Sequence, residues 1–313
     1  MSKKPIQKII KDKDLILGTA MWGWTIEKKE CFRMLDFFYD KGFKAVDIAP
    51  NYPINNNHNY FRYAENILLE WININNICDL EIISKIGSYD NSGNPKNNLS
   101  FSFILMNYQY YIEKFGKNLK NLMVHWDNRN SASAIELTIK ALEFIKAKGI
   151  NIGLAGIKNP KLYFESQSQA ILNCTFELKH NIFSTTIKNY SMFKKTARFL
   201  VYGVNASGLK INQVYHSKNN IIVRKKDQES KRYGKTINKI DKFLIKKSKY
   251  PLWKITNFNH IGMIYAYNTS WVDGIIIGPS SIVKLEDTIL FFKKLVNNDS
   301  THIYENIKAL CYK

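Results

Sequence analysis

The chain has 313 residues, is 45% hydrophobic and carries a formal charge of +20. Its length and hydrophobic content are enough to bury a large core, either as one barrel or as two ordinary domains. No apolar run approaches the roughly 18 residues of a membrane span, and the charged N-terminal segment lacks the apolar core of a signal peptide. We therefore expect a cytoplasmic protein with no membrane partner. The basic residues are mostly scattered Lys, which indicates a solvated surface rather than a specific nucleic-acid interface.

The four cysteines lie far apart and show no paired spacing: Cys31, Cys78, Cys174 and Cys311. In a cytoplasmic protein, this pattern predicts free thiols in or near the core and contains no zinc or redox motif. No metal site is expected.

In the first half of the chain, short apolar runs alternate with longer amphipathic segments, which indicates strands alternating with helices. One helix is marked by an apolar face of Cys31, Met34, Leu35 and Phe38 and by Gly42 at its end. The expected strands are 15–19, 45–48, 81–86 and 122–126, and the expected helices are 28–41, 64–71, 101–115 and 133–148.

The second half continues the alternation, with expected strands at 152–157, 171–178, 200–204 and 274–277. Strands that alternate with helices favour a parallel sheet, and eight such units close into a (β/α)8 TIM barrel. A doubly wound Rossmann domain is the alternative, but no G-x-G-x-x-G follows the first strand. No linker composition divides the chain, so we interpret residues 1–313 as a single barrel domain.

About seventy residues separate the seventh and eighth strands, more than one helix needs, so an insertion is expected at roughly 205–250. Within it, 210–236 is polar and basic and is predicted to form a large loop on the active face. Its cations could contact an anionic substrate such as a phosphorylated or nucleotide-linked sugar: Arg224, Lys225, Lys226, Lys231 and Arg232.

Three apolar strands end on ionisable residues. The strand at 45–48 contains Asp47 and leads to Tyr52, the third strand carries Lys85, and the fourth carries His125. Taken alone, each residue is better explained by packing, capping or solvation than by a functional role. Because the ends of parallel barrel strands meet at one face, we expect the four side chains to converge there.

These motifs resemble the aldo-keto reductase family over nearly the whole chain. The resemblance is carried by Leu17-Gly18-Thr19-Ala20-Met21-Trp22-Gly23, Asp40-Lys41-Gly42-Phe43, Val46-Asp47-Ile48-Ala49 with Tyr52, Ala64-Glu65, Ser84-Lys85, His125-Trp126, Gly278-Pro279-Ser280-Ser281 and Leu285-Glu286-Asp287. Each piece is short, and their order on successive strand ends makes the match specific.

The resemblance implies NAD(P)H-dependent reduction of an aldehyde or ketone, including a sugar or another polar carbonyl. It implies that Tyr52 donates the proton, that Lys85 lowers the pKa of Tyr52, and that Asp47 orients Lys85. His125 would polarise the carbonyl through a hydrogen bond. The alternative is a regulatory or scaffold barrel that binds the cofactor with little turnover.

The resemblance also implies a cofactor site that departs from the family pattern in places. Lys284 stands where relatives often offer an arginine to a 2′-phosphate. We therefore expect NADP rather than NAD as the cofactor. Thr288 replaces an adenine-contacting Asn, Lys158 replaces a Ser before Asn159, and Glu177 replaces a Gln but can accept from the carboxamide. The implied cofactor residues are Gly18, Thr19, Asp47, Asn159, Glu177, Tyr202, Gly203, Gly278, Ser280, Ser281, Lys284 and Asp287, with Tyr202 stacking on the nicotinamide.

Three tryptophans are expected to line the barrel mouth and contact the substrate: Trp22, Trp24 and Trp126. They would offer apolar, stacking surface to a small-molecule carbonyl. The sequence does not identify that molecule.

Overall fold

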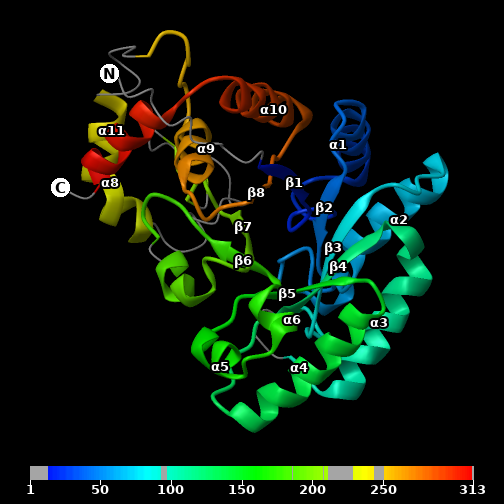
Figure 1. The fold of residues 1–313 in the computed structure, drawn as a ribbon. Coiled ribbons are helices and arrows are strands. Elements are labelled where there is room, and N and C mark those ends of the chain that lie inside the picture. The colour runs from blue at the N-terminus through cyan, green and yellow to red at the C-terminus, as the bar shows by residue number, and fades with distance from the viewer. Residues whose placement is uncertain are drawn as a thin grey trace, which may run out of the picture.

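The structure, a computed structural model, describes residues 13–92, 97–184, 186–206, 208–210, 228–242 and 250–311, without the side chains of 228–233. Eight parallel strands form a closed barrel in the order β1 to β8, and each strand pairs with the next along the chain. The last strand, β8, pairs with β1 and closes the ring. Helices surround the barrel (Figure 1), so the predicted (β/α)8 fold is confirmed.

The barrel strands are short, and most match the ranges expected from the sequence. They are β1 (Asp14–Gly18), β2 (Ala45–Ile48), β3 (Glu81–Ile86), β4 (Leu119–His125), β5 (Asn151–Ala155), β6 (Thr175–Lys179), β7 (Arg198–Tyr202) and β8 (Gly274–Ile277). The expected sixth strand at 171–178 is wrong at its start, because Gln169–Leu172 form a helical turn that Ser168 caps. The hydroxyl of Ser168 accepts from the backbone N–H of Ile171, and the chain becomes extended only at Thr175.

The helices follow the strands in the alternating order that the sequence indicates. They are α1 (Lys28–Asp40), α2 (Tyr63–Asn75), α3 (Phe101–Phe115), α4 (Ala132–Ala147), α5 (Pro160–Glu165), α6 (Gln169–Leu172), α8 (Gln228–Ile240), α9 (Phe258–Asn268), α10 (Ile282–Asn297) and α11 (Thr301–Cys311). Three short 3₁₀ segments are η1 (His58–Tyr60), η2 (Gly116–Asn118) and η3 (Thr186–Phe193). No described helix has the length and apolar character needed to cross a bilayer.

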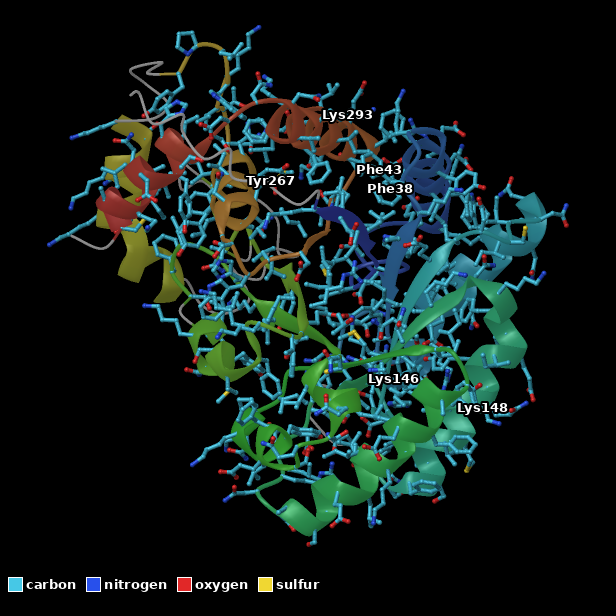
Figure 2. All side chains as sticks on the ribbon, viewed as in Figure 1. Phe38, Phe43, Lys146, Lys148, Tyr267 and Lys293 are labelled. Atoms are coloured by element: carbon cyan, nitrogen blue, oxygen red, sulfur yellow. The ribbon has the colours of Figure 1, made fainter. Side chains whose placement is uncertain are left out.

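Aromatic packing joins the first helix to α10. Phe38 of α1 stacks on Phe43 with ring centroids 5.2 Å apart, and Phe43 meets Phe292 of α10 edge-on at 6.1 Å (Figure 2). Tyr267 of α9 also meets Phe292 edge-on, with ring centroids 6.0 Å apart. Such pairs contribute roughly 0.5–1.5 kcal/mol each beyond their buried area, so they stabilise the side of the barrel where β1 meets β8.

The insertion contains more regular structure than the sequence suggests. The last third of the predicted basic loop is helical, since Gln228–Ile240 form α8, whose Ile237 and Ile240 are buried. This helix packs beside α11 (Figure 1), so its apolar residues explain why the prediction of a loop is wrong there. Residues 211–227 and 243–249 lie outside the described part of the chain, together with Arg224, Lys225 and Lys226 and the side chains of Lys231 and Arg232.

All four cysteines are free thiols, as predicted, but they differ in exposure. Cys31 and Cys174 are buried, and burial raises the pKa of each thiol to about 12. Cys78 is exposed, so a position in or near the core is wrong for this residue.

Candidate active site

The candidate site sits directly on the apolar interior of the barrel. Six side chains form an interior cluster: Ile16, Ile83, Met123, Ala155, Leu200 and Ile276. Because side chains alternate across a strand, residues two positions further along face the interior again, one level nearer the C-terminal face. This next level contains Gly18, Lys85, His125, Tyr202 and Gly278, with Asp47 from β2 and Glu177 from β6.

Lys85 is the centre of a buried ionic cluster. Its side chain is 0% exposed, and its Nζ atom contacts the carboxylate of Asp47 and both oxygens of Glu177, at 3.2 and 3.3 Å. In a closed ring of eight strands, β2 and β6 are on opposite walls. The ammonium of Lys85 therefore links Asp47 and Glu177 across the barrel mouth.

The charges of this cluster shift one another's protonation. Burial alone would lower the pKa of Lys85, but attraction by Asp47 and Glu177 outweighs it and raises that pKa well above 10.5. Burial, followed by repulsion from Glu177, raises the pKa of Asp47 well above 3.8, although Lys85 opposes this. Lys85 thus stays charged at neutral pH, and its two carboxylate partners repel each other.

Tyr52 is buried beside the cluster, with its ring centroid 5.2 Å from the Lys85 Nζ atom. Burial raises the pKa of Tyr52 above its ordinary value of 10.0; Lys85 opposes this rise, while Asp47 and Glu177 add to it. The net shift of the Tyr52 pKa is therefore upward. Lys85 acts in the expected direction, but burial and the two carboxylates outweigh its charge.

His125 lies against Tyr52, with the two rings edge to face and their centroids 6.4 Å apart. Burial, together with the charge of Lys85, lowers the pKa of His125 well below 6.5, so the imidazole is neutral at physiological pH. Its buried Nδ1 atom has no hydrogen-bond partner among the described residues. No described residue thus fixes its tautomer through Nδ1, and either ring nitrogen is available to donate.

Tyr202 ends β7 at the same level and is 38% exposed, which leaves part of its ring open. Partial burial, then repulsion by Glu177, raises the pKa of its phenol to about 12. The next residue, Gly203, has φ of 66°, and an added Cβ there would meet only the flexible side chain of Lys179. The mouth of the barrel therefore presents an open aromatic ring close to the charge of Glu177.

On the β1 side, backbone and hydroxyl groups hold the strand ends together. The buried hydroxyl of Thr19 donates to the carbonyl oxygen of Asp47 at 2.9 Å. A Cβ on Gly18 would lie 3.0 Å from Ile276 and 3.1 Å from the carbonyl oxygen of Ile277. Gly18 is thus required for the close approach of β1 and β8, and Thr19 orients the strand that carries Asp47.

The start of α10 offers donors on an exposed surface. Ser281 caps the helix, and the Nζ atom of Lys284 donates to the Ser280 hydroxyl at 2.6 Å. An added Cβ on Gly278 would meet nothing within 4 Å, so the chain leaves open space where β8 ends. One donor is already used, because the backbone N–H of Ile282 donates to the carboxylate of Glu30 at 2.7 Å.

Further along α10, α9 and its N-cap contact the expected cofactor residue Asp287 and also Thr288, which replaces the family's adenine-contacting Asn. Asp287 accepts from the Asn257 amide at 3.1 Å and contacts the Nε2 atom of His260 at 3.0 Å. Thr288 is buried, and its hydroxyl accepts from the amide of Asn259 at 3.1 Å. The residues that the sequence did not single out here are Glu30, Asn257, Asn259 and His260, since each acts through a partner distant in sequence.

The remaining expected residues, Asn159 and the three tryptophans, differ in how far they are exposed at the barrel mouth. The amide of Asn159 donates to the carbonyl oxygen of Arg129 at 2.8 Å. Trp22 is fully buried in the core and offers no open ring face, whereas Trp24 and Trp126 are partly exposed. Among the described residues, no group of three His, Cys, Asp or Glu side chains is arranged to bind a metal.

The site's donors suit a nicotinamide dinucleotide at both ends. Lys284, Ser280 and the capped start of α10 provide a cation, a hydroxyl and helix donors for a phosphate, and Gly278 leaves space for it. At the barrel mouth, the partly exposed ring of Tyr202 lies at the same level as His125 and Lys85. The residues present therefore fit such a cofactor.

Comparisons with known proteins agree with this arrangement. Residues 14–308 match the model of the Aldo/keto reductase family. A search of curated proteins finds no match.

Solved structures share the fold of this chain. The glycerol dehydrogenase AKR11B4 from Gluconobacter oxydans is similar, with a TM-score of 0.67 and 16% identity over 90% of both chains. The holo form of the aldo-keto reductase AKR11C1 from Bacillus halodurans is similar, with a TM-score of 0.68 and 15% identity over 95% of this chain and 92% of that one. At such low identities, the likeness shows the fold.

Proposed function

Because this chain belongs to the aldo/keto reductase family, it is an oxidoreductase that uses a nicotinamide cofactor, and we propose that it reduces an aldehyde or ketone with NADP(H) and with Tyr52 as the proton donor. The observation that carries the proposal is the buried contact of Lys85 with Asp47 beside Tyr52 and His125. We interpret residues 1–313 as one catalytic barrel.

Tyr52 is the acid of the proposed reaction. The bound cofactor would supply a hydride to the carbonyl carbon, and the carbonyl oxygen then needs a proton. The raised pKa of Tyr52 keeps its phenol protonated at neutral pH, so the donor is ready. As the O–H bond breaks, negative charge develops on the phenolic oxygen near Lys85, whose charge stabilises it in a site with little water.

His125, at the end of β4, would bind the same carbonyl oxygen. A neutral imidazole carries one N–H donor, and the low pKa of His125 keeps it neutral. Its hydrogen bond would strengthen as charge builds on the oxygen, which lowers the barrier. Asp47 holds Lys85 and acts as a positioning residue.

The cofactor would extend from Tyr202 to the start of α10. Tyr202 would stack on the nicotinamide, and Asn159 would hold its carboxamide. Lys284 and Ser280 would bind the 2′-phosphate, which NADP carries and NAD lacks. This contact supports a preference for NADP. The backbone at Gly18, Thr19, Gly203, Gly278 and Ser281, with Asp287, would line the remainder of the path.

The substrate would enter beside Trp24 and Trp126, which are partly exposed. Their rings suit the apolar part of a small carbonyl compound. A role for the cations around Arg224 in binding an anionic substrate stays a prediction. It would be contradicted if neutral and phosphorylated forms of one aldehyde showed equal kcat/KM.

The test combines cofactor binding with turnover. Purified protein is titrated with NADPH by fluorescence, and NADPH oxidation is then followed over a panel of small carbonyls with wild type and Tyr52→Phe. We expect tight binding by both proteins and a loss of kcat of about 10²–10⁴-fold in Tyr52→Phe, the range for removing a general acid. Binding without turnover of any carbonyl by wild type would favour a regulatory barrel instead.

A further inference from the structure

The buried cluster at the barrel mouth has unequal numbers of charges. Lys85 contributes one positive charge, and Asp47 and Glu177 together contribute two negative charges when ionised. All three side chains are at least 95% buried. Among the described residues, Lys85 is the single ion-pair partner of both carboxylates. With both carboxylates ionised, the cluster therefore has one negative charge more than Lys85 matches.

The neighbouring polar groups do not supply the missing positive charge. His125 is neutral, because burial and Lys85 lower its pKa well below 6.5. Tyr52 and Tyr202 are neutral phenols, since both have pKa values above 10.0. Burial, followed by repulsion from Glu177, raises the pKa of Asp47 despite the contact with Lys85.

Glu177 lies on the strand next to the place where a nicotinamide ring would stack. Its strand, β6, pairs with β7 at Glu177 and Leu200, and Tyr202, the open aromatic at this level of the barrel, follows two residues later. Burial, followed by repulsion from Glu177, raises the pKa of Tyr202. A nicotinamide ring is neutral when reduced and carries one positive charge when oxidised. In a site shielded from water, that difference interacts strongly with a nearby carboxylate.

We infer that Glu177 is a positioning residue that holds Lys85 from the wall opposite Asp47, and that its unmatched charge makes the site prefer the oxidised, cationic nicotinamide over the reduced one. This inference rests on the proposed function. It gives Glu177 a different role from the expected contact with the carboxamide, because both of its carboxylate oxygens face Lys85.

The test is the ratio of two dissociation constants, that of NADPH divided by that of NADP⁺, measured for the full chain by calorimetry at pH 7.5. Glu177→Gln removes the charge and keeps the shape of the side chain. We expect this ratio to fall by about tenfold in Glu177→Gln, because one charge interaction near the ring is lost. Glu177→Asp, which keeps the charge, should stay closer to wild type than Glu177→Gln.

A matched control removes another buried carboxylate. Glu65 on α2 is buried and pairs with Arg62 at 3.0 Å rather than with Lys85, so Glu65→Gln should leave the ratio unchanged. Circular dichroism on each variant verifies that it is folded. The ratio, unlike stability, does not respond to a merely structural role.

The outcomes separate this inference from the proposed function. If both nucleotides bind and the ratio is the same in wild type and Glu177→Gln, the inference is wrong and the proposed function stands. If wild type binds neither nucleotide, the proposed function is wrong, and the inference is wrong with it. A lower ratio in Glu177→Gln alone supports both.

Discussion

The barrel mouth and the first turn of α10 contain the same kinds of ionic groups in opposite surroundings. At the mouth, Lys85 is 0% exposed between Asp47 and Glu177. On α10, Lys284 is exposed and donates to Ser280. Charges in a shielded site interact strongly and are costly to leave unpaired, whereas exposed charges are screened by water and salt. Substitutions at the mouth should therefore change stability and catalysis together, and substitutions on α10 should change cofactor affinity alone.

The largest effect should follow from Lys85→Met, which leaves two carboxylates buried without a cation. We expect the free energy of unfolding to fall by about 3–5 kcal/mol, the cost of breaking a buried ion pair from one side. Urea unfolding at pH 8 measures it. The triple variant that also carries Asp47→Asn and Glu177→Gln should recover most of this loss. No recovery would mean that the lysine stabilises through packing rather than through charge.

The next largest effect should follow from replacing His125, which should lower kcat and leave NADPH binding nearly unchanged. We expect His125→Gln to lower kcat by about 10²–10³-fold, the cost of removing one donor from a developing oxyanion. The dissociation constant for NADPH should stay within about twofold of wild type. His180→Gln, which removes another buried imidazole, is the control. An equal loss of kcat in that control would contradict a specific role for the imidazole.

His180 lies directly after β6, and its burial makes the fold sensitive to acid. Burial, with the charge of Lys13, lowers its pKa from 6.5 to about 4. The unfolded chain binds a proton at His180 more readily than the folded chain does. The stability of the fold with a neutral imidazole is therefore fully present above pH 6.5 and is lost as the pH falls toward 4. From pH 7 to pH 5, we expect the free energy of unfolding to fall by about 2 kcal/mol because of His180.

The measurement is the pH dependence of urea unfolding for wild type and His180→Gln. The variant should have lower stability at pH 7 and a shallower fall toward pH 5. Parallel curves would show that the acid sensitivity has another origin. The residue makes a polar contact with the Thr269 hydroxyl at 3.1 Å, so Thr269→Val is a control that retains the imidazole.

On the exposed side, Lys284→Ala should weaken NADPH binding by about fivefold, corresponding to about 1 kcal/mol for an exposed ion pair. Affinity for NADH should not change, because that cofactor lacks the 2′-phosphate. Raising the salt concentration to 1 M should remove most of the difference. Equal weakening for both cofactors would place Lys284 outside the 2′-phosphate site.

The smallest effect should come from Glu30, whose carboxylate accepts from the first N–H of α10 at 2.7 Å. A carboxylate there repels an incoming phosphate and uses a donor that the phosphate needs. We expect Glu30→Gln to tighten NADPH binding by about twofold, in line with the few tenths of a kcal/mol of a charge at a helix end. A fluorescence titration with NADPH and NADH tests this, and weaker binding would contradict it.

The sequence predicted the barrel and its strand ends well for a physical reason. Strand periodicity and the alternation of side chains depend on neighbouring residues, so the positions of Asp47, Lys85 and His125 follow from local pattern. The contact of Glu177 with Lys85 does not, because it depends on which strand lies across the ring. The net rise of the Tyr52 pKa, against the lowering by Lys85, does not follow from local pattern either, since burial is a property of the folded molecule.

The same limit applies to the exposed end of the site. The hydroxyl and cation at Ser280 and Lys284 are visible as a motif, but the carboxylate that occupies the α10 N-terminus comes from α1. Glu30 is distant from that helix in the sequence, and no periodic pattern links the two. Helix α8 was missed because its apolar residues are sparse among Lys and Asn.

The closure of the ring between β1 and β8 has a consequence for the chain as it is made. The first strand pairs through Leu15, Ile16 and Leu17 with a strand that ends at Ile277. At the usual 5–20 residues per second, a ribosome needs on the order of ten seconds or more to reach that point. Until then, one edge of β1 has no neighbour to accept its hydrogen bonds, and an open edge is a template for aggregation. We expect the nascent chain to depend on chaperones until its last strand emerges.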